Sequence, residues 1–142
     1  MRLQAGFEIE RPAAEVWGDL TAEHPLVWCR IVKDATWTSQ RPYGCGTTRV
    51  ARVFGGTNVV KERFFRWDKG RQHSFFIEET NSPVFRRFAE DYVVEPTSAS
   101  SCRFVWTIAA EPRPAARLLS PLNRRLLSTL FSDTRKHYGL AG

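Results

Sequence analysis

The chain has 142 residues, of which 42% are hydrophobic and 25% charged, so it suits one folded domain and is too short for two. No apolar run approaches the roughly 18 residues that a membrane-spanning helix needs. The N-terminal stretch also lacks the apolar core and cleavage site of a secretory signal. Cys29, Cys45 and Cys102 form neither a CxxC motif nor a metal-ligand spacing. We therefore expect a soluble, cytoplasmic domain with no membrane span.

The net charge of +6 is concentrated near the C-terminus. Residues 112–142 hold six of the 21 basic residues but only one of the 15 acidic residues. These arginines lack the interleaved aromatic side chains that are typical of nucleic-acid-binding segments, and they fall largely on the outer face of a predicted helix. An anionic membrane and a nucleic acid are both considered for these arginines, and we favour a solvated helix face with no nucleic-acid partner.

The first predicted element is a strand, because residues 2–10 alternate between apolar and other side chains. Pro12 fits the first position of a short helix that runs to about Leu20. A second short helix is expected around residues 25–28. From Ile31 onward the pattern is that of strands, separated by short segments rich in Gly, Pro, Asn and Ser, which predicts an antiparallel sheet. The six strands are expected at 31–37, 47–54, 58–67, 71–79, 84–96 and 102–111.

The C-terminal segment is predicted to be helical, with an interruption at Ser120 and Pro121. A Ser followed by Pro is typical of an N-cap and first helical residue, so the main helix is expected from Pro121 to about Tyr138. At 1.5 Å per residue it is about 27 Å long, enough to cross a sheet. Gly139 supplies the expected stop. One apolar stripe is expected to pack on the sheet, formed by Leu119, Leu122, Leu126, Leu127, Leu130, Phe131 and Tyr138.

This order of elements resembles the helix-grip fold of the START-like, or SRPBCC, superfamily. FEIERPAAEVWGDL resembles the family's opening strand and helix, Trp28 its tryptophan after the second helix, and GCGTTR its glycine turn. The segments at 59–79 and 90–108 resemble the central hairpins of polyketide cyclase/dehydrase-type bacterial members. The resemblance covers almost the whole chain. It implies one α+β domain over residues 1–142, with a seven-stranded curved antiparallel sheet wrapped around a long C-terminal helix and two short helices after the first strand.

In such a fold the helix covers the concave face of the sheet and leaves a cavity. Strand alternation assigns side chains to that face. The polar candidates are Glu62, His73 and Glu90, while Asn123 on the helix points either into the cavity or to solvent. The predicted apolar walls are Phe64, Phe75, Phe88, Tyr92, Phe104 and Trp106. On the opposite face, Phe65, Trp67 and Phe76 form either a self-association surface or a covered sheet edge, so both a monomer and a homodimer are considered.

A turn of two or four residues centred between Asn81 and Ser82 pairs His73 with Glu90, and a register shift makes them diagonal neighbours. An imidazole and a carboxylate that meet in an aromatic cavity have the components for proton transfer, so His73 and Glu90 are candidate catalytic residues. The alternative is a structural or rim-located pair in which each group forms hydrogen bonds with the other or with water.

Three functions remain open at this point. The first is the binding or transport of a small hydrophobic ligand, such as a lipid or polyketide-like molecule. The second is a polyketide cyclase, aromatase or dehydratase that uses the same cavity. The third is a protein-interaction domain whose cavity is filled by its own aromatic side chains. We expect no metal and no cofactor, because His24 and His137 have no metal-ligating neighbours and the two glycines of GCG lack a phosphate-loop context.

Overall fold

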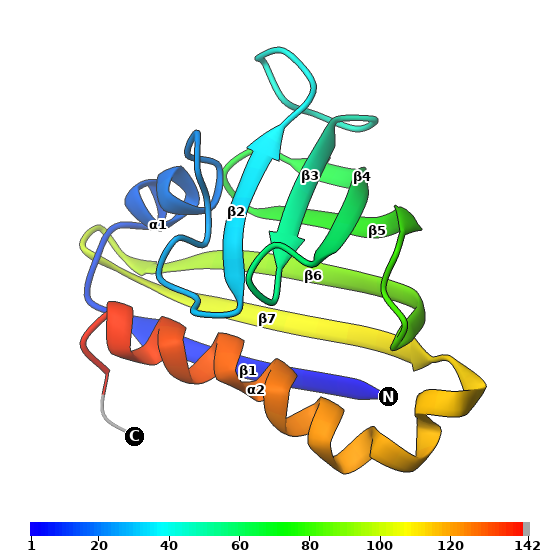
Figure 1. The fold of residues 1–142 in the computed structure, drawn as a ribbon. Helices are drawn as coiled ribbons and strands as arrows, with labels where there is room; N and C mark the ends of the chain where they lie inside the picture. Colours follow the sequence, from blue (N-terminus) through cyan, green and yellow to red (C-terminus); the bar gives the residue numbers. More distant parts are fainter. Residues whose placement is uncertain (141–142) are drawn as a thin grey trace.

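The computed structural model describes residues 1–140 and confirms the predicted helix-grip α+β fold (Figure 1). Seven strands form one sheet with the order β1-β7-β6-β5-β4-β3-β2, and every neighbouring pair is antiparallel. The elements are β1 (Arg2–Ile9), α1 (Ala13–Leu20), β2 (Val32–Trp37), β3 (Thr48–Val53), β4 (Asn58–Asp68), β5 (Gln72–Thr80), β6 (Phe85–Ser98), β7 (Ser101–Pro112), the 3-10 helix η1 (Pro114–Leu119) and α2 (Ser120–His137).

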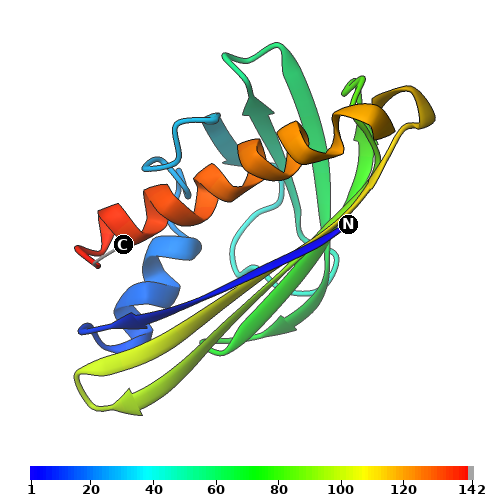
Figure 2. The same ribbon diagram turned by 90° about the horizontal axis from the view of Figure 1, so that it is seen from below.

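The sheet curves around α2, which lies across its concave side (Figure 2). The central strands alternate buried and exposed positions, so their inner faces form the core together with α1 and α2. No helix within residues 1–140 is long and apolar enough to cross a membrane.

The second short helix is a wrong prediction. Residues 25–28 form turns, in which the N–H of Cys29 donates to the carbonyl of Leu26 at 3.0 Å. Leu26 has a φ of 62°, in the left-handed region, and this backbone conformation does not continue a right-handed helix. The segment therefore reaches the sheet as an irregular loop.

The long helix begins and ends within one residue of the predicted bounds, and Gly139 follows it with a φ of 69°. Its apolar stripe is narrower than predicted. Leu127, Leu130, Phe131 and Tyr138 are buried, whereas Leu119, Leu122 and Leu126 are exposed. Successive helical residues are about 100° apart, so Leu126 points well to the side of its buried neighbour Leu127.

A register shift in β4 changes which aromatic side chains face the core. Phe64 pairs with Phe75, but the next pair is Arg66 with Ser74, so an extra residue is accommodated at Phe65. The shift turns Trp67 inward, where it packs against the core, although alternation had predicted it outward. Phe65 and Phe76 do lie on the outer face, with ring centroids 6.1 Å apart.

Candidate functional site

A cavity lies between α2 and the inner face of the sheet. The cavity volume is about 80 Å³. The free space that also includes the opening to solvent is about 740 Å³. It is therefore a narrow pocket with room for a small molecule or one end of a longer one. The lining residues are mostly apolar and come from the loops as well as the sheet and α2: Leu26, Ile31, Val32, Ala35, Arg49, Ala51, Val53, Phe54, Asn58, Val60, Glu62, Ile77, Thr80, Ser82, Phe85, Phe88, Glu90, Trp106, Leu127 and Leu130.

The most polar part of the cavity wall is an ion pair between Arg49 on β3 and Glu62 on β4. The two residues are directly opposite in the register of these strands, and Arg49 Nε donates to Glu62 Oε1 at 2.6 Å. Both side chains are buried, with 1% and 6% of their surfaces exposed. A buried charge is costly unless it is paired, so each of these residues requires the other.

Aromatic rings surround the rest of the Arg49 guanidinium. Its central carbon lies 5.0 Å from the ring centroids of Trp37 and Phe64 and 4.9 Å from that of Phe75. Within the described residues, neither terminal nitrogen of Arg49 makes a hydrogen bond. The Glu62 carboxylate raises the pKa of Arg49 against the opposing effect of burial, so Arg49 is positively charged at neutral pH and brings N–H donors to the cavity wall.

Glu90 on β6 is the second acidic residue in the cavity wall. Its Oε1 accepts hydrogen bonds from Trp106 Nε1 at 2.5 Å and from the Tyr92 hydroxyl at 3.1 Å. Burial, helped by the nearby negative charge of Glu62, raises the pKa of Glu90 to about 8. Glu90 is thus largely protonated at neutral pH, and the cavity combines one neutral carboxylic acid with one ion pair.

His73 lies outside the cavity wall, in the neighbouring part of the core. Aromatic rings enclose it, with centroids 5.1 Å away for Trp17 and Phe64, 5.2 Å for Trp67 and 4.8 Å for Tyr92. Neither ring nitrogen has a hydrogen-bond partner within residues 1–140. Burial, together with the positive charge of Arg49, lowers the pKa of His73 to about 3, so its imidazole is neutral.

The predicted direct pairing of His73 with Glu90 is wrong. His73 is opposite Tyr92, and Glu90 is opposite Phe75. The connection after β5 is residues 81–84, and the register centres the turn between Ser82 and Pro83, one position later than assumed, which shifts the pairing by two residues. The two side chains are diagonal neighbours without a hydrogen bond between them.

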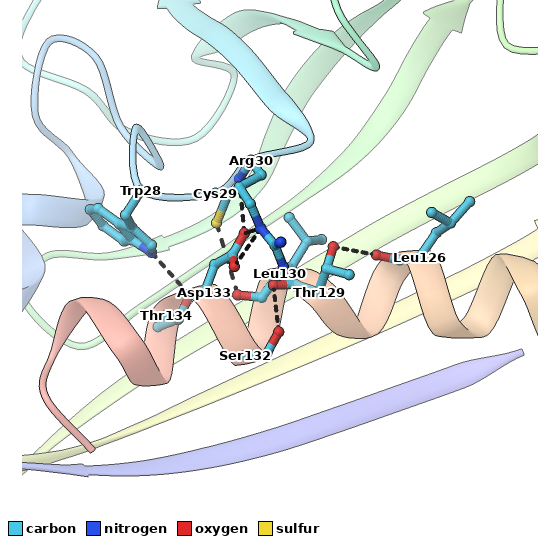
Figure 3. A network of polar contacts seen from close by, with 9 residues as sticks. All are labelled: Trp28, Cys29, Arg30, Leu126, Thr129, Leu130, Ser132, Asp133 and Thr134. Carbon is cyan, nitrogen blue, oxygen red and sulfur yellow. Dashed lines mark hydrogen bonds and ion pairs between the residues drawn. The ribbon is translucent and has the colours of Figure 1, made fainter. Parts of the chain in front are cut away.

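The loop before β2 closes one side of the cavity with Leu26 and Ile31, and α2 holds it in place (Figure 3). Trp28 Nε1 donates to the Thr134 hydroxyl at 3.0 Å. The main-chain N–H of Arg30 donates to Asp133 at 2.9 Å, and its side chain forms an ion pair with the same carboxylate at 3.0 Å. The position of this wall therefore depends on polar contacts with the last turns of α2.

Four of the ten predicted site residues line the cavity, namely Glu62, Phe88, Glu90 and Trp106. The side chain of Asn123 is buried without reaching the cavity, and its amide lies 3.5 Å from the carbonyl of Ala116 in η1. The other five fill the adjacent core: Phe64, His73, Phe75, Tyr92 and Phe104.

Arg49 is the functional candidate that sequence reasoning missed. It lies on the same face of β3 as Ala51 and Val53, both of which also line the cavity. The sequence does contain an indication of this pair. An arginine lies on an otherwise apolar face of one predicted strand, and a glutamate lies among apolar residues on a face of the next strand. The pairing of Arg49 with Glu62 depends on the register, which alternation alone does not give.

Comparison with known proteins identifies relatives of this chain. A family model described as polyketide cyclase / dehydrase and lipid transport matches residues 2–136. Rv2574, an uncharacterized protein of Mycobacterium tuberculosis, is 32% identical over 114 residues, covering 78% of this chain and 67% of that protein. A START superfamily protein from Mycobacterium smegmatis has a TM-score of 0.76 with 12% identity over 97% of both chains. Major latex-like protein 151 from Panax ginseng has a TM-score of 0.66 with 14% identity, also over 97% of both chains, and these two structures support the fold.

Proposed function

Since the chain belongs to the polyketide cyclase / dehydrase and lipid transport family, we propose that it binds a small, largely hydrophobic ligand between the sheet and α2. The observation that carries this proposal is the cavity itself, whose apolar wall is interrupted by Arg49, Glu62 and Glu90. Binding sites of this kind combine apolar area for affinity with a few placed polar groups for orientation.

The polar groups favour a ligand whose polar end accepts hydrogen bonds. Arg49 brings N–H donors that have no hydrogen-bond partner among residues 1–140, and the protonated carboxyl of Glu90 adds an O–H donor. A carbonyl or hydroxyl oxygen of the ligand that lies between Arg49 and Glu90 accepts hydrogen bonds from them. These replace the hydrogen bonds with water that the oxygen loses on binding. The narrow cavity fits such a group attached to an aromatic ring or a short acyl chain.

The same geometry supports a second candidate function, a cyclase or dehydratase reaction on a polyketide-like substrate. The supporting observation is Glu90, whose pKa of about 8 keeps a proton available near neutral pH. In this proposal Glu90 is the proton donor and Arg49 stabilises the developing oxyanion. His73, the other candidate catalytic residue, has no direct route to the ligand because it does not line the cavity.

The test is a thermal-shift screen of the whole chain against fatty acids, sterols, flavonoids and aromatic polyketides. A ligand at 100 times its Kd adds about 2.7 kcal/mol to the stability, which raises the Tm by several degrees for a domain of this size. Ala51→Leu places a larger side chain in the cavity wall and should abolish the shift. Ala109→Leu adds the same atoms at an exposed position on β7 and should retain it.

The outcomes separate the proposed functions. Selective stabilisation by one chemical class, lost in Ala51→Leu, supports ligand binding. Turnover of that ligand, lost in Glu90→Gln, supports the enzymatic candidate. The absence of any shift across the panel contradicts both and favours an interaction domain with a closed cavity.

A further inference from the structure

The start of the C-terminal helical segment exposes four leucines. The exposed fractions are 92% for Leu118, 54% for Leu119, 52% for Leu122 and 36% for Leu126. Three of them recur at intervals of four residues and the fourth is adjacent, so the exposed leucines follow one another from the end of η1 into the first two turns of α2. Single exposed leucines are common, but four in so short a segment form an apolar surface, which we call the leucine patch.

Positive charge accompanies the leucine patch. Arg113, Arg117, Arg124 and Arg125 lie on the same segment, and no acidic residue occurs between Glu111 and Asp133. All four arginines are exposed, and within residues 1–140 none of them forms an ion pair. Elsewhere on the surface several arginines are matched with acids, as in the pairs Arg52–Asp34 and Arg63–Glu78, and those with no acidic partner in the described part of the chain are scattered along it.

The leucine patch adjoins the cavity. Leu127 and Leu130 of α2 line the cavity, and Leu126 projects from α2 on the side that also carries Asp133, away from β1 (Figure 3). At the other end of the patch, the N–H of Arg113 donates to the carbonyl of Val84 at 2.7 Å, and its side chain donates to the carbonyl of Ser82 at 3.0 Å. Ser82 and Phe85 also line the cavity.

We propose that the leucine patch docks on an anionic lipid surface, with the leucines in the interface and the surrounding arginines at lipid phosphates. A basic helical segment with one apolar side is the arrangement that binds in the plane of a membrane without crossing it. The uniform sign of the charge is complementary to an anionic bilayer. Docking itself does not depend on the proposed function. Only its consequence rests on that function, namely that the ligand enters and leaves the cavity at the lipid surface.

The test is co-sedimentation with vesicles of phosphatidylcholine alone or mixed with phosphatidylglycerol. We expect binding to the anionic vesicles, weakened by salt, and little binding to the neutral ones. Leu118→Ser combined with Leu122→Ser should lower the affinity about tenfold or more, and Arg125→Gln about fivefold. The matched control, Phe65→Ser with Phe76→Ser, removes two exposed apolar side chains on the outer face of the sheet and should bind as the wild type does.

Three results would overturn the proposal. The first is an absence of binding to anionic vesicles, and the second is equal binding by the wild type and the double leucine variant. The third is a wild-type dimer in light scattering that becomes a monomer in this variant, because the leucine patch is then a self-association surface. The substituted leucines are exposed, so the Tm should stay within about two degrees of the wild type. Ala51→Leu should retain vesicle binding, so failure of the cavity proposal and failure of the docking proposal are distinguishable.

Discussion

The space under α2 has two halves, which differ in the hydrogen-bond partners and the charge of their polar side chains. In one half, which we call the filled half, His73 is packed among aromatic rings, and its ring nitrogens have no hydrogen-bond partner in the part of the chain that the structure describes. The other, the hollow half, is the cavity, where Arg49, Glu62 and Glu90 interact with one another or with neighbouring donors. The filled half holds its polar residue in the neutral form, whereas the hollow half holds an ion pair beside a neutral carboxylic acid.

Side-chain size decides which half is hollow. On β2 and β3 the inner positions next to the cavity include Ala35 and Ala51, which leave space beneath α2. The inner positions of β4 to β7 that face the filled half include large rings, and the register shift in β4 adds Trp67 to them. A curved sheet under one helix therefore gives a cavity only where its inner side chains are small.

The largest expected effect is the acid sensitivity of the filled half. The pKa of His73 is about 3 in the folded chain and about 6.5 in the unfolded chain. Between these values the unfolded chain binds a proton that the folded chain does not, so the free energy of unfolding decreases as the pH falls from 6.5 towards 3. The loss is on the order of 5 kcal/mol at 1.36 kcal/mol per pKa unit. Urea unfolding between pH 3 and 8 should show this loss in the wild type and its absence in His73→Phe.

His73→Phe should also be more stable than the wild type at pH 7, by about 1–3 kcal/mol, because it removes two buried nitrogens that have no hydrogen-bond partner among the described residues. His24→Gln is the matched control, since His24 is exposed and its replacement should leave the acid loss unchanged. An identical pH profile for His73→Phe and the wild type would show that the filled half admits water.

A loss of similar size but opposite direction is expected from the hollow half. The pKa of Glu90 rises from 4.5 to about 8, so the folded chain retains a proton that the unfolded chain releases. The contribution of Glu90 to the free energy of unfolding is therefore fully present below pH 4.5 and is lost as the pH rises through 8, again by an amount on the order of 5 kcal/mol. The same unfolding series on Glu90→Gln should show no such alkaline loss.

Gln keeps an acceptor oxygen for Trp106 and Tyr92, so the substitution tests ionisation and not the hydrogen bonds. Between pH 4.5 and 6.5 the contributions of His73 and Glu90 oppose each other. Each variant should consequently reveal the slope of the other group in that range, and a flat profile in both variants would contradict the assignment.

The next effect in size is that of breaking the ion pair. Glu62→Gln leaves the Arg49 charge buried without its partner and should destabilise the chain by about 3–5 kcal/mol in urea unfolding. Glu78→Gln breaks the half-exposed pair with Arg63 and should cost at most about 1 kcal/mol. Equal costs for the two variants would mean that Arg49 escapes to solvent when it loses Glu62.

The fold could be predicted from the sequence because alternation, short turns and a long amphipathic helix are local patterns. The walls of the cavity were predicted less well, because they depend on register. The shift at Phe65 turned Trp67 inward, and a turn after β5 that is centred one position later than assumed separated His73 from Glu90. The ion pair of Arg49 with Glu62 is a contact between two strands, and no pattern within either strand specifies it.

The smallest expected effect on stability comes from replacing the ion pair by apolar side chains of similar volume. Arg49→Met combined with Glu62→Leu removes both charges together and avoids the cost of leaving one unpaired, so the free energy of unfolding should stay within about 1 kcal/mol of the wild type. The variant makes the hollow half as apolar as the filled half while keeping its space. If it folds normally but loses the thermal shift of a ligand that stabilises the wild type, the ion pair serves recognition. A retained shift would mean that the apolar wall alone selects the ligand, and the polar contrast between the two halves would then be a matter of folding.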